Sequence, residues 1–484
     1  MWRLICASAG TDPSPRSRRT FSTVVSRREA GGVMTIAVGR DCTVSNIGVR
    51  GSSLLPFPGL MRYVPSGPIR NSQAGHFRED IMRASLASLL ISSGLLVAMM
   101  TPGHAEIDVK VGVLNDMSGV YSDTGGKGSV IAAQMAVEDF ARTSRDVHVE
   151  IVSADHQNKP DVGAGIARGW YDRDGVDAIL DVPTSSVALA VNQVTREKNK
   201  IFINSGAGTA DLTGKACSPN TIHWTYDTVA LANGTGKAML KRGGNTWYFL
   251  TADYAFGLAL QNDTTAVIEK NGGKVLGASR VPFPSSDFSS FLLQAQASKA
   301  KVVGLANAGG DTINAVKQAH EFGLTESGQT LAALLIYVVD VHSLGLETAQ
   351  GLTLTESFYW DLTPETRAFS ERFMRRNDGK MPTMNQAGVY AGLLHYLKAI
   401  AATNSKDPQV TMAWMKSNPT DDPLFGKGYI RADGRKIHNM YLFEVKKPSE
   451  SKGEWDVYKL LETIPGEQAF RPLSEGGCPL VGKS

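Results

Sequence analysis

Glycine-rich segments are the first candidates for chemistry, because the backbone amides of a glycine-rich loop can hold phosphate groups. A phosphate loop needs the spacing G-x-x-x-x-G-K-[ST], in which the lysine reaches the phosphates. The segment 208–216 has one residue too many between its glycines, the segment 234–238 has too few, and both end in alanine. The sequence therefore argues against nucleotide hydrolysis.

Histidines and cysteines form no recognisable catalytic or metal-binding motif. H-E-x-x-H, C-x-x-C and G-x-S-x-G are all missing from the sequence. The adjacent pair Asp155 and His156 could bind a metal ion, but two ligands without a third make a weak site. We therefore expect a protein that is not an enzyme, with no cofactor and no metal.

Polar clusters follow six predicted strands, each at the carboxyl end of its strand. Open α/β sheets bind ligands at this edge. One such cluster would be an ordinary turn, but six at the same end favour a shared binding cleft. The clusters are MSGVYSDTGG (117–126), PTSS (183–186), NSGAGT (204–209), ADYAFG (252–257), ANAGGD (306–311) and YVVD (337–340).

Two series of alternating strands and helices must position these clusters, which predicts an α/β fold with parallel sheets. A first series runs to residue 206, a second from 233 to 338, and a tail of extended and helical segments ends in a predicted hairpin. Predicted strands are 109–116, 147–155, 176–182, 200–206, 246–253, 274–281, 301–307, 331–338, 353–360, 439–445 and 455–461. Predicted helices are 128–141, 162–171, 185–197, 233–241, 257–271, 288–298, 311–322, 363–376 and 386–402.

The first 105 residues have the composition of leader segments. Residues 82–105 contain one arginine, an apolar run and small residues at Gly103 and Ala105, the order of a cleaved secretory signal peptide. A membrane anchor is the alternative. Residues 1–81 contain no lysine, and we interpret them as a leader read from upstream of the true start at Met82, with an organelle transit peptide as the alternative.

Charge and cysteine usage agree with export. The full chain carries 50 basic and 47 acidic residues, and removing residues 1–105 leaves 38 and 42, so the predicted exported part is acidic overall. This balance makes nucleic acid an unfavourable partner. Cys217 and Cys478 remain in the exported part; they could pair in an oxidising compartment or stay as two thiols.

These clusters, in this order after a signal peptide, resemble the periplasmic solute-binding proteins of ABC importers with the type I fold, in the leucine/isoleucine/valine-binding family. The resemblance covers roughly residues 107–445, and its most specific pieces are VKVGVLNDMSGVYSDTGG, INSGAGTADLT and LTADYAFGLAL. It implies two Rossmann-like lobes, joined by three chain crossings, that close on a small ligand. The crossings would fall near Tyr226, Glu356 and Phe425.

The lobe boundaries follow from these crossings. Lobe 1 would comprise residues 107–226 and 357–425, and lobe 2 residues 227–356 and 426–484. The resemblance also implies a monomer in the periplasm that hands its ligand to a membrane permease and its ATPase.

Ligand-binding residues are likewise implied by the resemblance. On lobe 1 they are hydroxyls and amides at helix N-termini that hold a carboxylate, and Tyr121 as a wall. On lobe 2 they are Tyr254 or Phe256, Asn307 beside the ANAGGD cluster, and an acid, Asp340, that would hold the ammonium of an amino acid. The lobe 1 donors are Thr184, Ser185, Ser186, Ala207 and Thr209.

The sequence departs from the amino-acid binders at two places. A glutamate is usual where Asp340 stands, and small residues replace the usual aromatic near ANAGGD. A wider pocket with Tyr121, Tyr254, Phe256 and Tyr337 around it would take an aromatic carboxylate, such as a lignin-derived benzoate or cinnamate, as well as leucine.

Two further classes of function were weighed against an importer's binding protein. An extracytoplasmic sensor of the same fold should carry a second membrane segment or an output domain, and a hydrolase should carry a nucleophile, a base and an orienting acid. The sequence to Ser484 presents neither set. The expected function is therefore solute binding for import, with a sensor for a membrane signalling protein as the alternative.

Overall fold

The computed structural model describes residues 3–7, 22–29, 32–37 and 106–482. The chain divides into two compact units, Met1–Val97 and Ala98–Ser484. In the first unit, strands β1 (Arg3–Ala7), β2 (Ser22–Glu29) and β3 (Gly32–Ala37) form an antiparallel sheet in that order. The predicted signal peptide, residues 82–105, lies outside the described residues.

The second unit begins with a five-stranded parallel sheet in the order β5-β4-β6-β7-β8. Strands β6 and β7 are buried along their whole length, because parallel strands are covered on both faces. Helices α2 and α13 (Met384–Thr403) pack against each other, as do α3 and α4. The elements of this first lobe are β4 (Ile107–Asn115), α2 (Gly126–Phe140), β5 (Val147–Asp155), α3 (Pro160–Asp172), β6 (Ala178–Asp181), α4 (Ser185–Glu197), β7 (Ile201–Asn204), η1 (Ala210–Thr213) and β8 (Thr221–His223).

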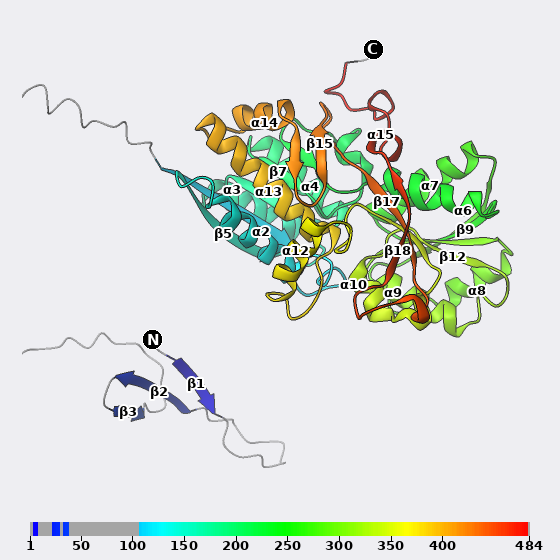
Figure 1. The fold of residues 1–484 in the computed structure, drawn as a ribbon, viewed down its shortest axis with the longest axis horizontal. Helices are drawn as coiled ribbons and strands as arrows, with labels where there is room; N and C mark the ends of the chain where they lie inside the picture. Colours follow the sequence, from blue (N-terminus) through cyan, green and yellow to red (C-terminus); the bar gives the residue numbers. More distant parts are fainter. Residues whose placement is uncertain (1–2, 8–21, 30–31, 38–105, 483–484) are drawn as a thin grey trace, which may run out of the picture. The chain divides into compact units, whose positions relative to one another are not determined.

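A four-stranded parallel sheet in the order β10-β9-β11-β12 forms the second lobe. Figure 1 shows the two sets of helices and strands side by side, with β17 (Met440–Val445) and β18 (Tyr458–Ile464) running between them. The elements of this lobe are α5 (Thr228–Leu231), the π-helical turn η2 (Ala232–Gly236), α6 (Lys237–Lys241), β9 (Thr246–Ala252), α7 (Ala255–Lys270), β10 (Lys274–Val281), α8 (Ser289–Ala297), β11 (Val302–Ala306), α9 (Gly310–Glu321), β12 (Thr330–Ala333), α10 (Val338–Leu344) and α11 (Leu346–Ala349). The predicted α/β class with two Rossmann-like lobes is confirmed.

The predicted strand 331–338 is wrong in its second half. Strand β12 ends at Ala333, because its ladder with β11 ends at the pair Leu305 and Ala333. The apolar residues that follow are buried without belonging to a strand, and α10 begins at Val338. A continuous apolar run shows burial but not where strand pairing stops.

The tail adds helices to the first lobe and two small sheets. A sheet of order β13-β17-β18 contains the predicted hairpin, whose strands pair antiparallel. The sheet β14-β15-β16 was not predicted, because its strands are short. Helix α14 was not predicted either, although Asp407 at its N-cap and Pro408 at its first position are typical of a helix start. The elements are β13 (Thr353–Glu356), α12 (Pro364–Met374), α13 (Met384–Thr403), α14 (Pro408–Ser417), β14 (Thr420–Asp422), β15 (Gly426–Ile430), β16 (Lys436–Ile437), β17 (Met440–Val445), η3 (Pro448–Glu450), β18 (Tyr458–Ile464), α15 (Gly466–Ala469) and η4 (Leu473–Glu475).

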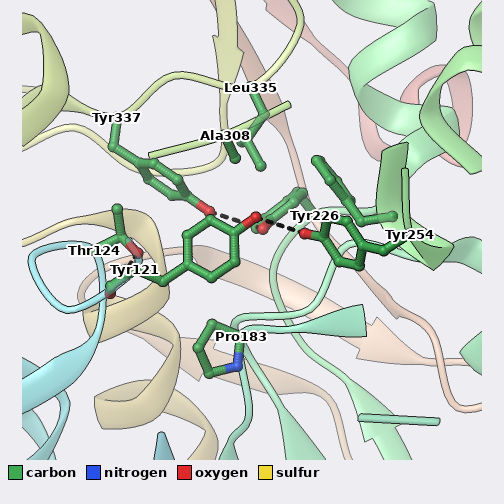
Figure 2. Close-up of a pocket in the computed structure, with 9 residues that line it drawn as sticks. Tyr121, Thr124, Pro183, Tyr226, Tyr254, Ala308, Leu335 and Tyr337 are labelled. Atoms are coloured by element: carbon green, nitrogen blue, oxygen red, sulfur yellow. Dashed lines mark hydrogen bonds between the residues drawn. The ribbon is translucent and has the colours of Figure 1, made fainter. Parts of the chain in front are cut away.

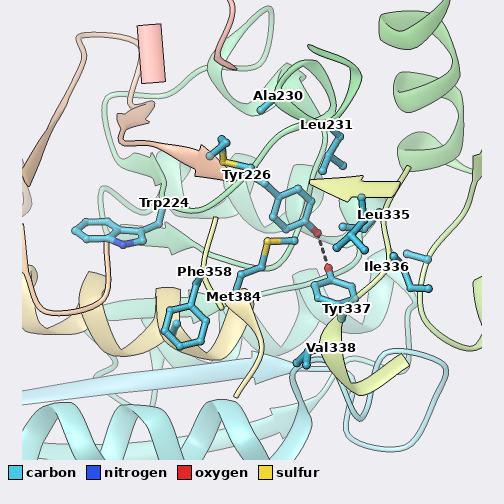
Figure 3. Close-up of a cluster of buried hydrophobic side chains, with 14 of the residues drawn as sticks. Trp224, Tyr226, Ala230, Leu231, Leu335, Ile336, Tyr337, Val338, Phe358 and Met384 are labelled. Carbon is cyan, nitrogen blue, oxygen red and sulfur yellow. Dashed lines mark hydrogen bonds between the residues drawn. The ribbon is translucent and has the colours of Figure 1, made fainter. Parts of the chain in front are cut away.

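A buried cluster joins segments from both lobes and the tail. Figure 3 shows that Trp224, Tyr226, Tyr337, Phe358 and Met384 gather there from four separate stretches of the chain. These side chains belong to one continuous hydrophobic core that extends through both lobes. The segments that cross between the lobes are therefore held by packing rather than by exposed linkers.

A buried cation reinforces this crossing region. Arg435 is fully buried and donates hydrogen bonds to the carbonyl oxygens of Thr225 (2.8 Å) and Tyr226 (3.2 Å). Its guanidinium also lies 3.6 Å from the carboxylate of Asp227. A buried charge of this kind needs partners for each of its donors, so Arg435 fixes the backbone of residues 225–227. No helix in the described part of the chain has the length and apolar character needed to cross a bilayer.

A disulfide bond ties the end of the chain to the first lobe. Cys217 and Cys478 are bonded, and they lie 261 residues apart in the sequence. The segment before Cys478 also contacts the second lobe, since the side chain of Asn233 donates to the carbonyl oxygen of Ala469 (2.9 Å). The C-terminal segment therefore touches both lobes.

Replacing both cysteines, Cys217→Ser with Cys478→Ser, should lower the free energy of unfolding by about 2–4 kcal/mol, because the unfolded chain loses a long cross-link. Urea unfolding of the variant and of the oxidised and reduced wild type measures this change. The reduced wild type should match the variant. Equal stability of all three proteins would contradict the assignment of a stabilising bond.

Candidate functional site

A small, nearly filled pocket with a cavity volume of about 10 Å³ lies where the loops of the two lobes meet. Figure 2 shows phenol side chains pointing into it from both sides. Its lining combines four tyrosines with apolar side chains, and none of the nine lining residues carries a charge. They are Tyr121, Thr124, Pro183, Tyr226, Tyr254, Phe256, Ala308, Leu335 and Tyr337.

Helix N-termini surround this pocket. Thr124, Pro183 and Ala308 each lie two residues before the first residue of a helix, namely α2, α4 and α9. Tyr254 and Tyr337 stand at the N-cap positions of α7 and α10. In α4, α7 and α9 the N-cap side chain makes no capping bond, whereas the first N–H of α2, that of Gly126, donates to Oδ1 of Asn115 (2.8 Å). The free N–H groups and dipoles of α4, α7 and α9 therefore favour negative charge at the pocket.

Two glycines let the chain pass beneath the pocket. A Cβ atom on Gly206 would lie 2.6 Å from Cα of Pro183, and one on Gly208 would lie 2.8 Å from ring atoms of both Tyr226 and Phe256. Side chains at either position would push the lining residues apart. The glycines of the INSGAGTADL stretch thus serve close approach, not phosphate binding.

A buried carboxylate shapes the loop that carries Tyr121. Asp116 accepts hydrogen bonds from the backbone N–H groups of Gly119 (2.7 Å) and Tyr121 (2.9 Å) and from the side-chain amide of Asn158 (2.7 Å). These bonds turn the chain directly after β4. They place the phenol of Tyr121 over the strand ends.

Two pairs of tyrosine hydroxyls meet in the pocket. The hydroxyl oxygens of Tyr121 and Tyr254, which come from different lobes, lie 2.6 Å apart. Those of Tyr226 and Tyr337 lie 2.8 Å apart. Burial raises the pKa of all four phenols above the ordinary value. The four phenols therefore keep their protons at neutral pH, and the pocket is polar without being charged.

An aromatic side chain that the sequence analysis missed covers one side of the site. The ring of Phe283 stacks on that of Tyr254, with centroids 4.2 Å apart, and lies 5.7 Å from the ring of Tyr121. Phe283 follows β10, so it also stands at the carboxyl end of a parallel strand. The same positional rule that picked the six clusters could have found it.

The predicted residues of lobe 1 separate into two groups. Tyr121 lines the pocket, whereas the carboxylate donors lie behind it and are engaged within the lobe. The backbone N–H of Thr209 donates to Oγ of Ser185 (3.2 Å), and that of Ala207 donates to Oδ1 of Asn204 (3.1 Å). Thr184 donates its hydroxyl to Asn158, and Ser186 is half-buried on α4. Their role toward a ligand stays a prediction.

The predicted residues of lobe 2 separate in the same way. Tyr254 and Phe256 line the pocket. The side-chain oxygen of Asn307 accepts from Thr312 (2.7 Å), while its buried Nδ2 has no partner among the described residues. Asp340 accepts the backbone N–H of Tyr337 (3.0 Å) and so caps α10. Whether either contacts a ligand stays a prediction.

Several lining residues were not predicted as site residues. Tyr226 was expected as a crossing point, and it also lines the pocket. Thr124, Pro183 and Ala308 fall inside predicted clusters but were not singled out, and Leu335 carries no chemical signal of its own. Asn385 reaches the site from α13, where its side chain donates to the hydroxyl of Tyr337 (3.3 Å). Helical periodicity alone would assign Asn385 to packing.

The Asp155–His156 pair does not form a metal centre in the described residues. No group of three or more metal-ligating side chains occurs in the part of the chain that the structure describes. His156 is buried, and burial lowers its pKa to about 4. Its Nδ1 accepts the backbone N–H of Asn158 (3.0 Å), which gives this histidine a structural role.

Comparison with known proteins identifies relatives over most of the chain. Residues 108–454 match the model of a periplasmic binding protein family. A Leu/Ile/Val-binding protein homolog 6 from Brucella melitensis is 26% identical over 372 residues, which cover 74% of this chain and 93% of that protein.

Solved structures extend the comparison. A periplasmic binding protein from Burkholderia mallei is 53% identical, with a TM-score of 0.75. The match covers 77% of this chain and 99% of the Burkholderia mallei chain. A branched chain amino acid ABC transporter periplasmic ligand-binding protein from Burkholderia xenovorans LB400 is 43% identical, with a TM-score of 0.69 and the same coverage. These names come from binding and transport, so the sensor alternative is not favoured.

Asp340 makes stability depend on pH. Burial raises the pKa of its carboxyl to about 7, from 3.8 ordinarily. The folded protein then binds a proton that the unfolded chain releases, so this carboxyl should raise the free energy of unfolding as the pH falls from about 7 to about 4.

Asp340→Asn should remove this contribution while keeping an oxygen for the cap of α10. The quantity to compare is the free energy of unfolding of the variant minus that of the wild type. We expect this difference to be larger at pH 8 than at pH 4.5 by on the order of 2–4 kcal/mol. Other buried carboxyls titrate in both proteins and cancel in the difference. Urea unfolding at the two pH values measures it, and parallel pH profiles would refute the assignment.

Proposed function

The chain belongs to the periplasmic binding protein family, and we propose that it is the solute-binding component of an ABC importer, which traps a small aromatic carboxylate between its two lobes. The observation that carries this proposal is the gathering of five helix N-termini, those of α4, α7 and α9 without a capping N-cap side chain, around a pocket without charged side chains. The protein binds and releases its ligand and performs no catalysis.

The negative charge of the ligand is inferred from the helices. Helices α4, α7 and α9 each contain twelve residues or more, and their N-cap side chains make no capping hydrogen bond. Helix N-termini of this kind bind carboxylates and other anions through their N–H groups and dipoles. With no basic side chain among the lining residues, this is the main favourable field that an anion would meet there.

The aromatic body of the ligand is inferred from the walls. Four phenols and the ring of Phe256 line the pocket, and Phe283 stacks over Tyr254 at its margin. Aromatic rings pack well in offset or edge-to-face contact with other rings. An amino acid would also need a negatively charged acceptor for its ammonium group, and neither Asp340 nor any other carboxylate is among the lining residues. These features favour an aromatic acid over a branched-chain amino acid.

Trapping by the two lobes is supported by the contacts across the pocket. The bond between Tyr121 and Tyr254 joins the loop after β4 to the N-terminus of α7. We propose hinge crossings near Tyr226, Glu356 and Phe425, with lobe 1 made of residues 107–226 and 357–425 and lobe 2 of the remainder. Closure of such lobes around a ligand is a common hinge motion.

The setting of this function follows from the family. We propose that the protein works outside the cytoplasm, in the periplasm, as a monomer that delivers its ligand to a membrane permease coupled to an ATPase. The bond between Cys217 and Cys478 suits an oxidising compartment.

Isothermal titration calorimetry with benzoate, cinnamate, leucine and the neutral analogue benzamide tests the proposal. We expect benzoate- and cinnamate-type acids to bind at least about tenfold more tightly than leucine and than benzamide, because benzamide has the ring without the charge. Tighter binding of leucine would reverse the proposed ligand class. Equal binding of benzoate and benzamide would remove the argument from helix N-termini.

A further inference from the structure

The hydrogen-bond directions in the pocket differ between its two tyrosine pairs. We propose that Tyr226 and Tyr337 form an accept-only pair, which selects aromatic acids carrying a hydroxyl group on the ring. This inference rests on the proposed function, because it assumes that the pocket binds an aromatic carboxylate. Each step of the assignment follows from which atoms carry hydrogens.

The carbonyl of Gly206 fixes the first direction. Its oxygen lies 2.6 Å from the hydroxyl of Tyr226, and since a carbonyl has no hydrogen, Tyr226 must be the donor. The hydroxyl of Tyr226 also lies 2.8 Å from that of Tyr337. Because a phenol has one hydroxyl hydrogen, Tyr337 must supply the hydrogen of this second bond.

Asn385 completes the chain of donors. Its amide lies 3.3 Å from the hydroxyl of Tyr337, which has already given its hydrogen to Tyr226. The contact is therefore satisfied only when Nδ2 of Asn385 donates, which settles the orientation of this fully buried amide. The donors run from Asn385 to Tyr337, then to Tyr226 and finally to the carbonyl of Gly206. Figure 3 shows the Tyr226–Tyr337 bond beside Met384, the neighbour of Asn385 in the sequence.

Neither phenol of this pair has a hydrogen left for a ligand. Each oxygen keeps one free lone pair, so each can still accept. Burial raises the pKa of both phenols, which keeps the chain protonated as described at neutral pH. A ligand group that packs against these oxygens must therefore donate a hydrogen bond.

The second pair, Tyr121 and Tyr254, differs in this respect. Their single shared bond of 2.6 Å uses one of two hydroxyl hydrogens, and the other is free to donate to a carboxylate oxygen. Figure 2 shows both pairs facing the same pocket. The complementary ligand is an aromatic carboxylate whose ring carries a hydroxyl group.

Two acids that differ in one group test this inference. 4-Hydroxybenzoate can donate to the accept-only pair, whereas 4-fluorobenzoate has nearly the same shape and cannot. For the wild-type protein, we expect calorimetry to give a dissociation constant for 4-hydroxybenzoate that is at least about tenfold lower than that for 4-fluorobenzoate. The fluorine atom cannot donate a hydrogen bond, so it leaves the buried oxygens of Tyr226 and Tyr337 without a donor.

Two matched variants locate the source of the preference. In Tyr226→Phe the hydrogen of Tyr337 is released and can serve either acid, so the ratio of the two dissociation constants should fall towards one. Tyr337→Phe also loses one phenol hydroxyl, but in this variant Tyr226 still donates its hydrogen to the carbonyl of Gly206 and can only accept from a ligand. A clear preference for 4-hydroxybenzoate over 4-fluorobenzoate should therefore remain. Thermal unfolding checks that both variants fold.

The outcomes separate the two claims. Equal affinity of the wild type for both acids overturns the accept-only pair and leaves the proposed function standing. An unchanged ratio in Tyr226→Phe also overturns it. Failure of both acids to bind the wild type at millimolar concentration overturns the proposed function itself, and the inference with it. The wild-type ratio needs no variant and stays informative if one of them does not fold.

Discussion

The parallel pairing of strands is the constraint on which the rest of this structure depends. Because all strands of each large sheet run in the same direction and alternate with helices, each helix that directly follows one of these strands begins at the edge where that strand has just ended. Polar N–H groups therefore gather at one edge of each sheet. The two lobes turn these edges toward a common pocket, and the lining residues stand at the beginnings of five helices.

This arrangement produces an unusual chemical environment. In the proposed function negative charge is held by backbone N–H groups, while the four phenols of the lining are kept neutral by burial. Glycines beneath the pocket allow the rings of Tyr226 and Phe256 to pack directly on the chain. The carboxylate of Asp116 and the guanidinium of Arg435 lie outside the lining, where they fix the loop of Tyr121 and the crossing at Tyr226. These two charged side chains thus stabilise the backbone around the site, and only uncharged side chains line the pocket itself.

The sequence predicted most of the fold because the alternation of short apolar runs and helical patterns is strong. Strand β5 and helix α4 begin and end at the predicted residues. The errors occur where local pattern and tertiary pairing disagree. The run from Leu331 is apolar throughout, but its pairing partner stops at Leu305 and the strand ends with it. The three-stranded sheet near Lys436 was missed because its strands are too short to show a period.

The sequence predicted where the candidate site lies better than it predicted the contacts of the individual side chains. The rule on strand ends places the clusters that contain Tyr121, Tyr254 and Phe256 at this edge of the sheets, and the resemblance to the binding-protein family picks out the residues themselves. Orientation follows from neither, since the sequence could not show that Asp340 turns back to cap α10 or that Ala207 gives its N–H to Asn204. Asn385 lies on a helix far along the chain and reaches the pocket only through the packing of α13.

The central claim is that a small aromatic anion is held between the lobes by helix N-termini and phenol hydroxyls, without a basic side chain. A crystal structure of the protein with bound 4-hydroxybenzoate tests it most directly. The account predicts a carboxylate inside the pocket, hydrogen-bonded to backbone N–H groups or to Tyr121 and Tyr254, with no lysine or arginine nitrogen within about 4 Å. A carboxylate paired with a lysine or arginine, or a ligand bound outside the pocket, would contradict it.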